Sequence, residues 1–174
     1  MRRAARLAVG LSLLAPGLGA CGFTPLYAIP GVTPNMAAIR VITPEGRTGH
    51  LLSEDLQDDL AVKRDEEPRY QLNLSVKEKR YARGTNFEQV SSWYELSLRV
   101  SFSLVDLSSG KTLTSGIMPV SVSYNDTTDP YAGVVAQQDG QERAASDAAQ
   151  RIRIMLAAYF AGKPLKVPGT SAGS

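Results

Sequence analysis

The chain has 174 residues, of which 43% are hydrophobic, with 19 basic and 17 acidic side chains, one histidine and one cysteine. This length suffices for one domain with a real hydrophobic core, and the near balance of charge gives no reason to expect a nucleic-acid-binding protein. A single cysteine excludes an intramolecular disulfide and a cysteine metal cluster.

The first 20 residues have the three parts of a secretory signal peptide. A basic start, MRRAAR, is followed by an uncharged apolar stretch over residues 7–20 that ends in small residues. As a helix this stretch would reach about 21 Å, short of the ~30 Å hydrocarbon core of a bilayer. We therefore expect a cleaved signal peptide over residues 1–20 rather than a transmembrane helix.

Cys21 follows that stretch directly in the order LGAC, which resembles a bacterial lipobox. In such sequences the thiol receives a diacylglycerol, the peptide bond before the cysteine is cut, and the new amine is acylated. We expect Cys21 to be the lipid-attachment site; the alternative is an incidental or buried thiol. Each buried methylene contributes about 0.8 kcal/mol, so two or more chains such as palmitate would hold the protein on a membrane. Gly22, where enteric inner-membrane lipoproteins have aspartate, favours the outer membrane.

The segment after the cysteine is rich in helix breakers. Residues 21–36 contain three prolines and two glycines, which predicts an extended, lipidated tether. Residues 37–42 are a candidate strand. Leucines at positions 52, 56 and 60 then predict one apolar face of a helix over residues 49–64.

Three segments with period-two alternation follow, over residues 70–77, 94–104 and 120–124. Alternation gives each strand one apolar face and one face toward water. The sequence DLSSGK predicts a hairpin turn between the second and third of these strands. Leu113 is out of phase with Val120, which predicts a β-bulge or an edge position.

A long amphipathic helix closes the folded region. Asp129 can cap its start, Pro130 suits its first turn, and Gly162 favours its end. Gly140 is a candidate kink, so one long helix and two shorter ones both remain open. Residues 163–174 have the composition of a disordered tail.

The element order is therefore strand, helix, three strands, helix. A sheet that is apolar on one face needs one covering layer, which the two amphipathic helices supply. We expect an α+β, two-layer sandwich over residues 37–162, with a four-stranded, mostly antiparallel sheet covered on one face by two helices.

Side chains suited to catalysis or metal binding are few. His50 stands beside the predicted helix start, where capping or surface roles are commoner than catalysis. The one GxSxG match, GTSAG at residues 169–173, falls in the expected disordered tail rather than at a predicted strand-to-helix turn, and the sequence has no glycine-rich phosphate loop. Acidic residues cluster in and after the predicted helix, but they lack EF-hand spacing. A solvated helix face is therefore a simpler interpretation of the cluster than a cation site. The cluster comprises Glu54, Asp55, Asp58, Asp59, Asp65, Glu66 and Glu67. We expect no enzymatic activity and no cofactor.

Basic side chains gather where the first of the three alternating strands is expected to end. A cationic patch can meet phosphate groups, but basic residues also protect edge strands against aggregation, and both interpretations stay open. Segment 81–93 is expected to be a loop, whose Phe87 and Trp93 either form a contact surface or line the rim of the core. The cations of this patch are Lys77, Lys79, Arg80 and Arg83, with Arg99 on the wet face of the next strand.

Several of these features coincide in one known family. The lipobox, the start CGFTPLY, the three-strand meander and the closing stretch over residues 123–160 resemble the LptE family of lipopolysaccharide-assembly lipoproteins, in its alphaproteobacterial form. The strongest local match, PYA…VA…D…ERAA…A…I…L, runs from Pro130 to Leu156. The resemblance implies a four-stranded sheet backed by two helices.

The resemblance also implies a partner, the outer-membrane barrel LptD. The lipoprotein would sit inside that barrel as a plug, help it fold and assist lipopolysaccharide transfer, without catalysing a reaction. It would be lipid-anchored at the outer membrane, facing the periplasm, with the five cations as candidate lipopolysaccharide contacts. The alternative is an unrelated periplasmic lipoprotein, either a scaffold or a binder of a small ligand.

Overall fold

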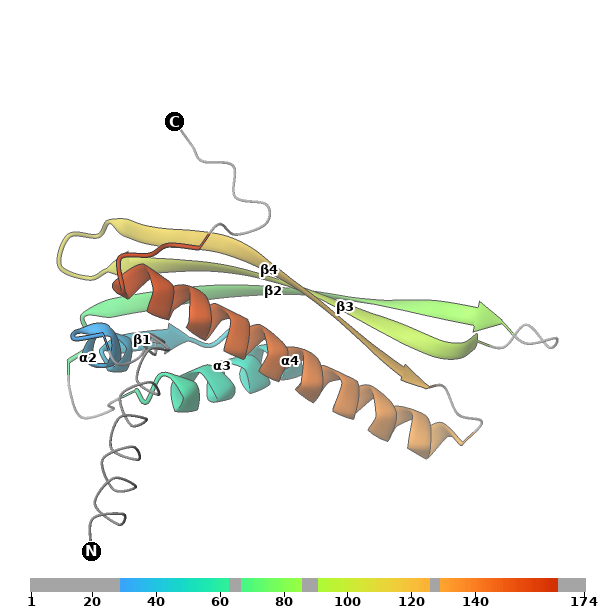
Figure 1. The fold of residues 1–174 in the computed structure, drawn as a ribbon. Helices are drawn as coiled ribbons and strands as arrows, with labels where there is room; N and C mark the ends of the chain where they lie inside the picture. The colour runs from blue at the N-terminus through green and yellow to red at the C-terminus, as the bar shows by residue number, and fades with distance from the viewer. Residues whose placement is uncertain (1–28, 63–66, 86–90, 126–128, 166–174) are drawn as a thin grey trace, which may run out of the picture.

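The structure is a computed structural model that describes residues 29–62, 67–85, 91–125 and 129–165 (Figure 1). Cys21, the signal peptide and most of the expected tail lie outside these residues, as do Asp65, Glu66 and Phe87. The described elements confirm the predicted order and add one short helix. In chain order they are α2 (Val32–Ala37), β1 (Ile39–Ile42), α3 (Arg47–Asp59), β2 (Tyr70–Thr85), β3 (Ser91–Asp106), β4 (Thr112–Asn125) and α4 (Pro130–Phe160).

The four strands form one open sheet in the order β1-β2-β3-β4. The pairs β2–β3 and β3–β4 are antiparallel, whereas β1 pairs in parallel with β2 because α3 connects them as a crossover helix. The sheet is therefore mixed, with antiparallel pairs in the majority as expected. Helices α3 and α4 cover the same face, which confirms the two-layer α+β architecture (Figure 1).

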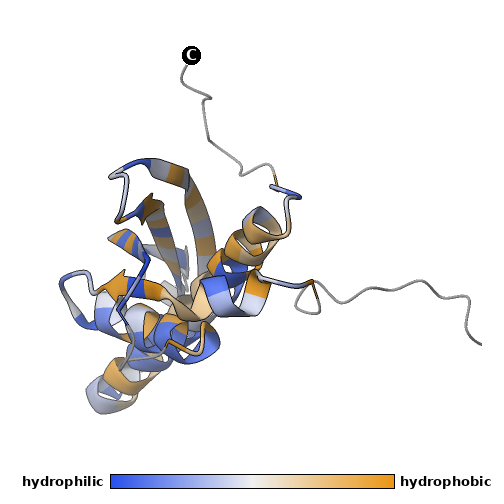
Figure 2. Cartoon of the chain, turned by 90° about the vertical axis from the view of Figure 1, so that its left-hand side faces the viewer, coloured by the Kyte–Doolittle hydropathy of each residue, from blue (hydrophilic) through white to orange (hydrophobic). Residues whose placement is uncertain are grey.

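The core lies between the sheet and these two helices, on the face that period-two alternation predicts. Leu96, Leu98, Val100 and Leu104 of β3 are fully buried, and Figure 2 shows apolar and polar residues alternating along the strands. Helix α4 meets this face largely through alanines, whose short side chains let helix and sheet approach closely. Its buried residues are Gly140, Ala144, Ala145, Ala148, Ala149, Ile152, Leu156, Ala157 and Ala158.

Helix α2 covers the end of the predicted tether, residues 21–36, and includes Ala37 of the predicted strand over residues 37–42, which begins at Ile39 instead. Val32 is fully buried and Met36 is 3% exposed, and both belong to the hydrophobic core. A six-residue helix with a proline has little stability of its own, so this packing accounts for it. The helix predicted over residues 49–64 also has different ends in the structure, because α3 begins at Arg47 and ends at Asp59.

Strands β2 and β3 are longer than predicted. The expected loop over residues 81–93 is largely strand, since β2 continues to Thr85 and Arg83 pairs with Trp93 of β3. The prediction of a bulge or an edge position is confirmed in both forms. Leu104 pairs with Thr114 and Val105 pairs with Thr112, so Leu113 is the extra residue, and β4 is an edge strand.

Helix α4 is continuous through Gly140, so the open alternative of a kink or two helices is settled. A Cβ atom at Gly140 would lie 3.0 Å from Cδ1 of Tyr124, which means that the glycine permits close packing on β4. The predicted ends are confirmed. Asp129 caps the helix by accepting a hydrogen bond from the N–H of Tyr131 at 2.9 Å, and Gly162 follows the last turn with φ +70°.

Gly49 of α3 occupies a second tight position, where alanine should destabilise the fold. A Cβ atom there would lie 2.8 Å from the carbonyl oxygen of Pro44, a backbone atom that has no other rotamer. We expect Gly49→Ala to lower the free energy of unfolding by about 1–2 kcal/mol, although alanine favours a helix by up to about 1 kcal/mol. Gly133→Ala, in open space on α4, is the matched control and should be neutral or stabilising. Urea denaturation of both variants tests the difference, and equal midpoints would contradict it.

Candidate functional site

The sheet face turned away from the helices carries a hollow of about 300 Å³. Its lining side chains all carry a polar or charged group, because the outward positions of β2 and β3 alternate with the core positions. Three of its residues are cations, one is aromatic and one is a hydroxyl residue. The lining residues are Lys77, Lys79, Tyr81, Ser97 and Arg99.

Two of these cations face each other directly across the strand pair. Lys77 of β2 is in register with Arg99 of β3, and like charges in that arrangement repel. Within the described ranges, Lys77, Lys79 and Arg99 form no hydrogen bond or ion pair with another side chain. The three cations therefore add a local positive potential that no side chain of the described residues neutralises through a direct contact, which suits an anionic ligand.

Arg83 lies on the same face but is engaged. Its Nε donates a hydrogen bond to Oε2 of Glu95 at 2.9 Å, in an ion pair across the strands. Its guanidinium also lies 5.4 Å from the ring centroid of Tyr81. Arg83 and Glu95 thus border the hollow and support the Tyr81 ring.

Arg80 lies on the opposite, helix-facing side of β2 and does not join the other four cations. Its guanidinium stacks 4.6 Å from the ring centroid of Tyr94, and it donates a hydrogen bond to Oε1 of Gln137 at 3.0 Å. Because neighbouring strand residues point to opposite faces, Lys79 and Arg80 cannot share one surface. The structure therefore divides the predicted basic patch between the two faces of the sheet.

Glu78 is a second polar residue on that helix-facing side. Its carboxylate accepts a hydrogen bond from the Thr48 hydroxyl of α3 at 2.6 Å and from the Gln141 amide of α4 at 3.0 Å. These contacts tie β2 to both helices beyond the apolar core. They also explain why the apolar alternation of β2 stops at Val76 while the strand continues.

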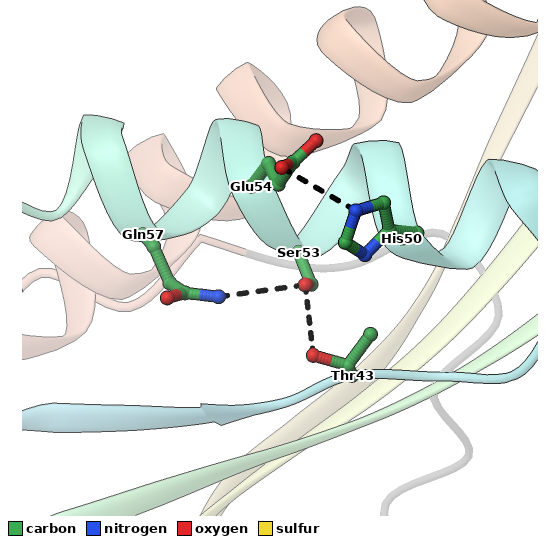
Figure 3. Close-up of polar contacts among 5 residues, drawn as sticks. All are labelled: Thr43, His50, Ser53, Glu54 and Gln57. Carbon is green, nitrogen blue, oxygen red and sulfur yellow. Dashed lines mark hydrogen bonds and ion pairs between the residues drawn. The ribbon is translucent and has the colours of Figure 1, made fainter.

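His50 is a surface residue of the first turns of α3. Its Nε2 lies 3.4 Å from Oε1 of Glu54 one turn later (Figure 3). The nearby Ser53 hydroxyl instead lies 2.9 Å from that of Thr43 and accepts a hydrogen bond from Gln57. Serine, histidine and glutamate therefore have no arrangement here that would activate a nucleophile.

Acidic side chains line a groove of about 380 Å³ between α3 and α4. Burial raises the pKa of Asp55, and the charges of Asp59, Asp58, Glu54 and Glu142 raise it further. Within the described ranges, no three side chains of His, Cys, Asp or Glu are grouped so that they could hold a metal ion. Carboxylates therefore repel one another around Asp55, and the ion pairs Arg47–Glu142 at 2.8 Å and Arg143–Asp139 at 2.9 Å partly offset the negative charge of the groove.

The raised pKa of Asp55 predicts a pH-dependent stability. The folded protein holds this proton to a higher pH than the unfolded chain, so the free energy of unfolding falls as pH rises through the folded pKa. We expect Asp55→Asn to raise the melting temperature at neutral pH and to have little effect near about pH 3, where both states are protonated. Glu67→Gln removes one carboxylate outside the groove and is the control for the change in net charge. An equal effect of Asp55→Asn at both pH values would contradict the prediction.

Comparison with known proteins identifies the family to which this chain belongs. The family model described as LptE, lipopolysaccharide-assembly, matches residues 35–156, which include every strand and most of α4. The chain belongs to the LptE family. No curated protein matches the chain. Across the described part of this LptE-family chain, no helix is long and apolar enough to cross a membrane.

Solved structures agree with the family. A Caulobacter crescentus CB15 protein described as a lipoprotein is 42% identical, with a TM-score of 0.66, over 78% of this chain and 99% of that one. A minor lipoprotein from Acinetobacter baumannii is 18% identical, with a TM-score of 0.57, over 76% of this chain and 98% of that one. Lipoprotein B from Nitrosomonas europaea is 16% identical, with a TM-score of 0.54, over 70% of this chain and 82% of that one. The last two likenesses concern the fold alone.

Tyr81 and Ser97 belong to the hollow of this LptE-family protein but were not among the predicted site residues. The alternation pattern could have identified both, because the odd-numbered positions of β2 and β3 lie on the outward face. This requires β2 to continue beyond Lys77. The apolar alternation of β2 stops near Lys77, which predicts the end of the strand there and a loop at Tyr81.

Proposed function

We propose that this protein is an outer-membrane lipoprotein that occupies the lumen of the LptD barrel, assists its folding and takes part in lipopolysaccharide transport and assembly. The observation that carries the proposal is membership in the LptE family over residues 35–156. Membership also argues against the alternative of an unrelated lipoprotein. The proposed role is one of binding and assembly, not catalysis.

The uncovered sheet face supports the lumen part of the proposal. A barrel lumen is polar, and this face presents serine, lysine and arginine side chains at its outward positions. The cations Lys77, Lys79 and Arg99 would contact the anionic groups of lipopolysaccharide on that face. Arg83 would border the same contact, whereas Arg80, which packs against Tyr94, would act by holding β2 to α4.

Lipid attachment at Cys21 is the second part of the proposal. The signal peptide would be removed before Cys21, and acyl chains would anchor the domain to the periplasmic side of the outer membrane. The Caulobacter crescentus protein at 42% identity is itself described as a lipoprotein, which supports this assignment.

Co-purification tests the partner. Tagged full-length protein, extracted in detergent from its own cells, should carry LptD in a one-to-one complex that survives gel filtration. Depletion of the protein should leave lipopolysaccharide at the inner membrane. Normal surface lipopolysaccharide in depleted cells would overturn the transport role.

Fatty-acid labelling tests the anchor separately. Cells fed a radioactive fatty acid should label the protein, and the Cys21→Ser variant should stay unlabelled. A labelled Cys21→Ser variant would overturn the attachment site while leaving the barrel partnership to the co-purification result.

A further inference from the structure

The hollow on the uncovered sheet face is lined by one small residue, Ser97, and by four long ones. Ser97 pairs with Ser121 of β4, so two short side chains lie next to each other on this face. Lys79 is directly opposite Ser97 on β2, and Arg99 is the next outward residue of β3. This contrast in side-chain length creates a recess on a sheet surface that would otherwise be flat.

The chemistry of the recess matches sugars better than hydrocarbon. Its apolar surface comes from the Tyr81 ring and from the methylene stems of its cations, whose charged ends an acyl chain would have to desolvate on entering. A sugar ring, by contrast, has apolar C–H faces that can lie on an aromatic ring, and hydroxyls that can pair with a serine. The unpaired cations add a requirement for negative charge, which a phosphate or a carboxylate on the sugar would meet.

We propose that this hollow binds an anionic hexose unit of the lipopolysaccharide headgroup, with Tyr81 as its stacking surface. The inference rests on the proposed function and assigns to this face the headgroup rather than the acyl chains. Arg99 and Lys77 hold the phosphate or carboxylate, and Ser97 pairs with a hydroxyl of the sugar.

Tyr81 is suited to this role because it is held in place while still exposed. The residue is 42% exposed, and the Arg83 guanidinium lies 5.4 Å from the centroid of its ring. Glu95, which is directly opposite Tyr81 in the register, fixes Arg83 through their 2.9 Å ion pair. Arg83 is therefore a positioning residue that acts through Tyr81.

The test uses the full mature protein in a polyoxyethylene detergent and the deacylated oligosaccharide of lipopolysaccharide, titrated by calorimetry. We expect saturable binding that weakens about tenfold or more in Tyr81→Leu and in Lys77→Gln combined with Arg99→Gln, and that stays within about twofold in Tyr81→Phe. A neutral oligosaccharide of equal length should not bind. Glucosamine phosphate and a uronic acid, used as competitors, distinguish phosphate from carboxylate as the source of charge.

Two results would overturn the inference. One is wild-type affinity in Tyr81→Leu, and the other is equally tight binding of the neutral oligosaccharide. Co-purification of the same variants with LptD separates this outcome from the proposed function. Tyr81→Leu should retain the barrel complex, so loss of oligosaccharide binding with an intact complex supports the headgroup site. If the wild-type protein did not co-purify with LptD, that result would refute the barrel partnership but not the headgroup site.

Discussion

Replacing Gly140 by leucine is expected to destabilise the protein by about 3 kcal/mol or more. A single Cβ atom at this position would already lie 3.0 Å from Cδ1 and 3.6 Å from Cε1 of Tyr124. Three further carbon atoms have no space, so the N-terminal half of α4 must move away from β4 or Tyr124 must leave its buried position. Overpacking of this kind typically costs about 1–3 kcal/mol, and separation of a helix from its sheet adds lost burial.

Gly133→Leu on the same helix is the matched control. No atom lies within 4 Å of a Cβ placed there, and leucine favours a helix over glycine by up to about 1 kcal/mol. Urea denaturation, followed by circular dichroism, should therefore show a lower midpoint for Gly140→Leu and an unchanged or higher one for Gly133→Leu. If both leucines behaved alike, Gly140 would not be a packing position.

Replacing Lys77 by glutamate is expected to stabilise the sheet and to weaken lipopolysaccharide binding in the same molecule. The new carboxylate would lie directly opposite Arg99 and turn a repulsive cross-strand pair into an attractive one. Such pairs are worth about 0.2–1 kcal/mol, so the melting temperature should rise slightly. Binding should fall by at least about tenfold, because one cation is lost and a second is neutralised.

Lys111→Glu separates this effect from a change in net charge. Lys111 is exposed just before β4, at the β3–β4 turn, and does not line the hollow. It carries the same charge reversal, and lipopolysaccharide binding should stay within about twofold of wild type. Vesicle co-sedimentation at two salt concentrations measures both variants. If Lys77→Glu bound as well as wild type, the uncovered sheet face would not be the binding surface.

Strand β3 could be predicted from the sequence, whereas only the first half of β2 could be. The alternation from Tyr94 to Leu104 predicted the buried face of β3, because the apolar residues there belong to the hydrophobic core or pack against it. In β2 the inward positions after Val76 are occupied by Glu78 and Arg80. Polar residues at inward positions break the apolar alternation and so predict the end of the strand. Both are satisfied by distant residues of α3 and α4, and no local pattern encodes those partners.

The sequence by itself determined the order of elements, the apolar faces of β3 and α3, the cap at Asp129, the bulge at Leu113 and the resemblance to the LptE family. These follow from side-chain period, capping chemistry and motif, which are local properties. Only the tertiary structure decided that helix α2 forms, that Gly140 packs rather than kinks, and which cations share a face. Each of these depends on contacts between residues far apart in the chain, where packing space and hydrogen-bond partners outweigh local preference.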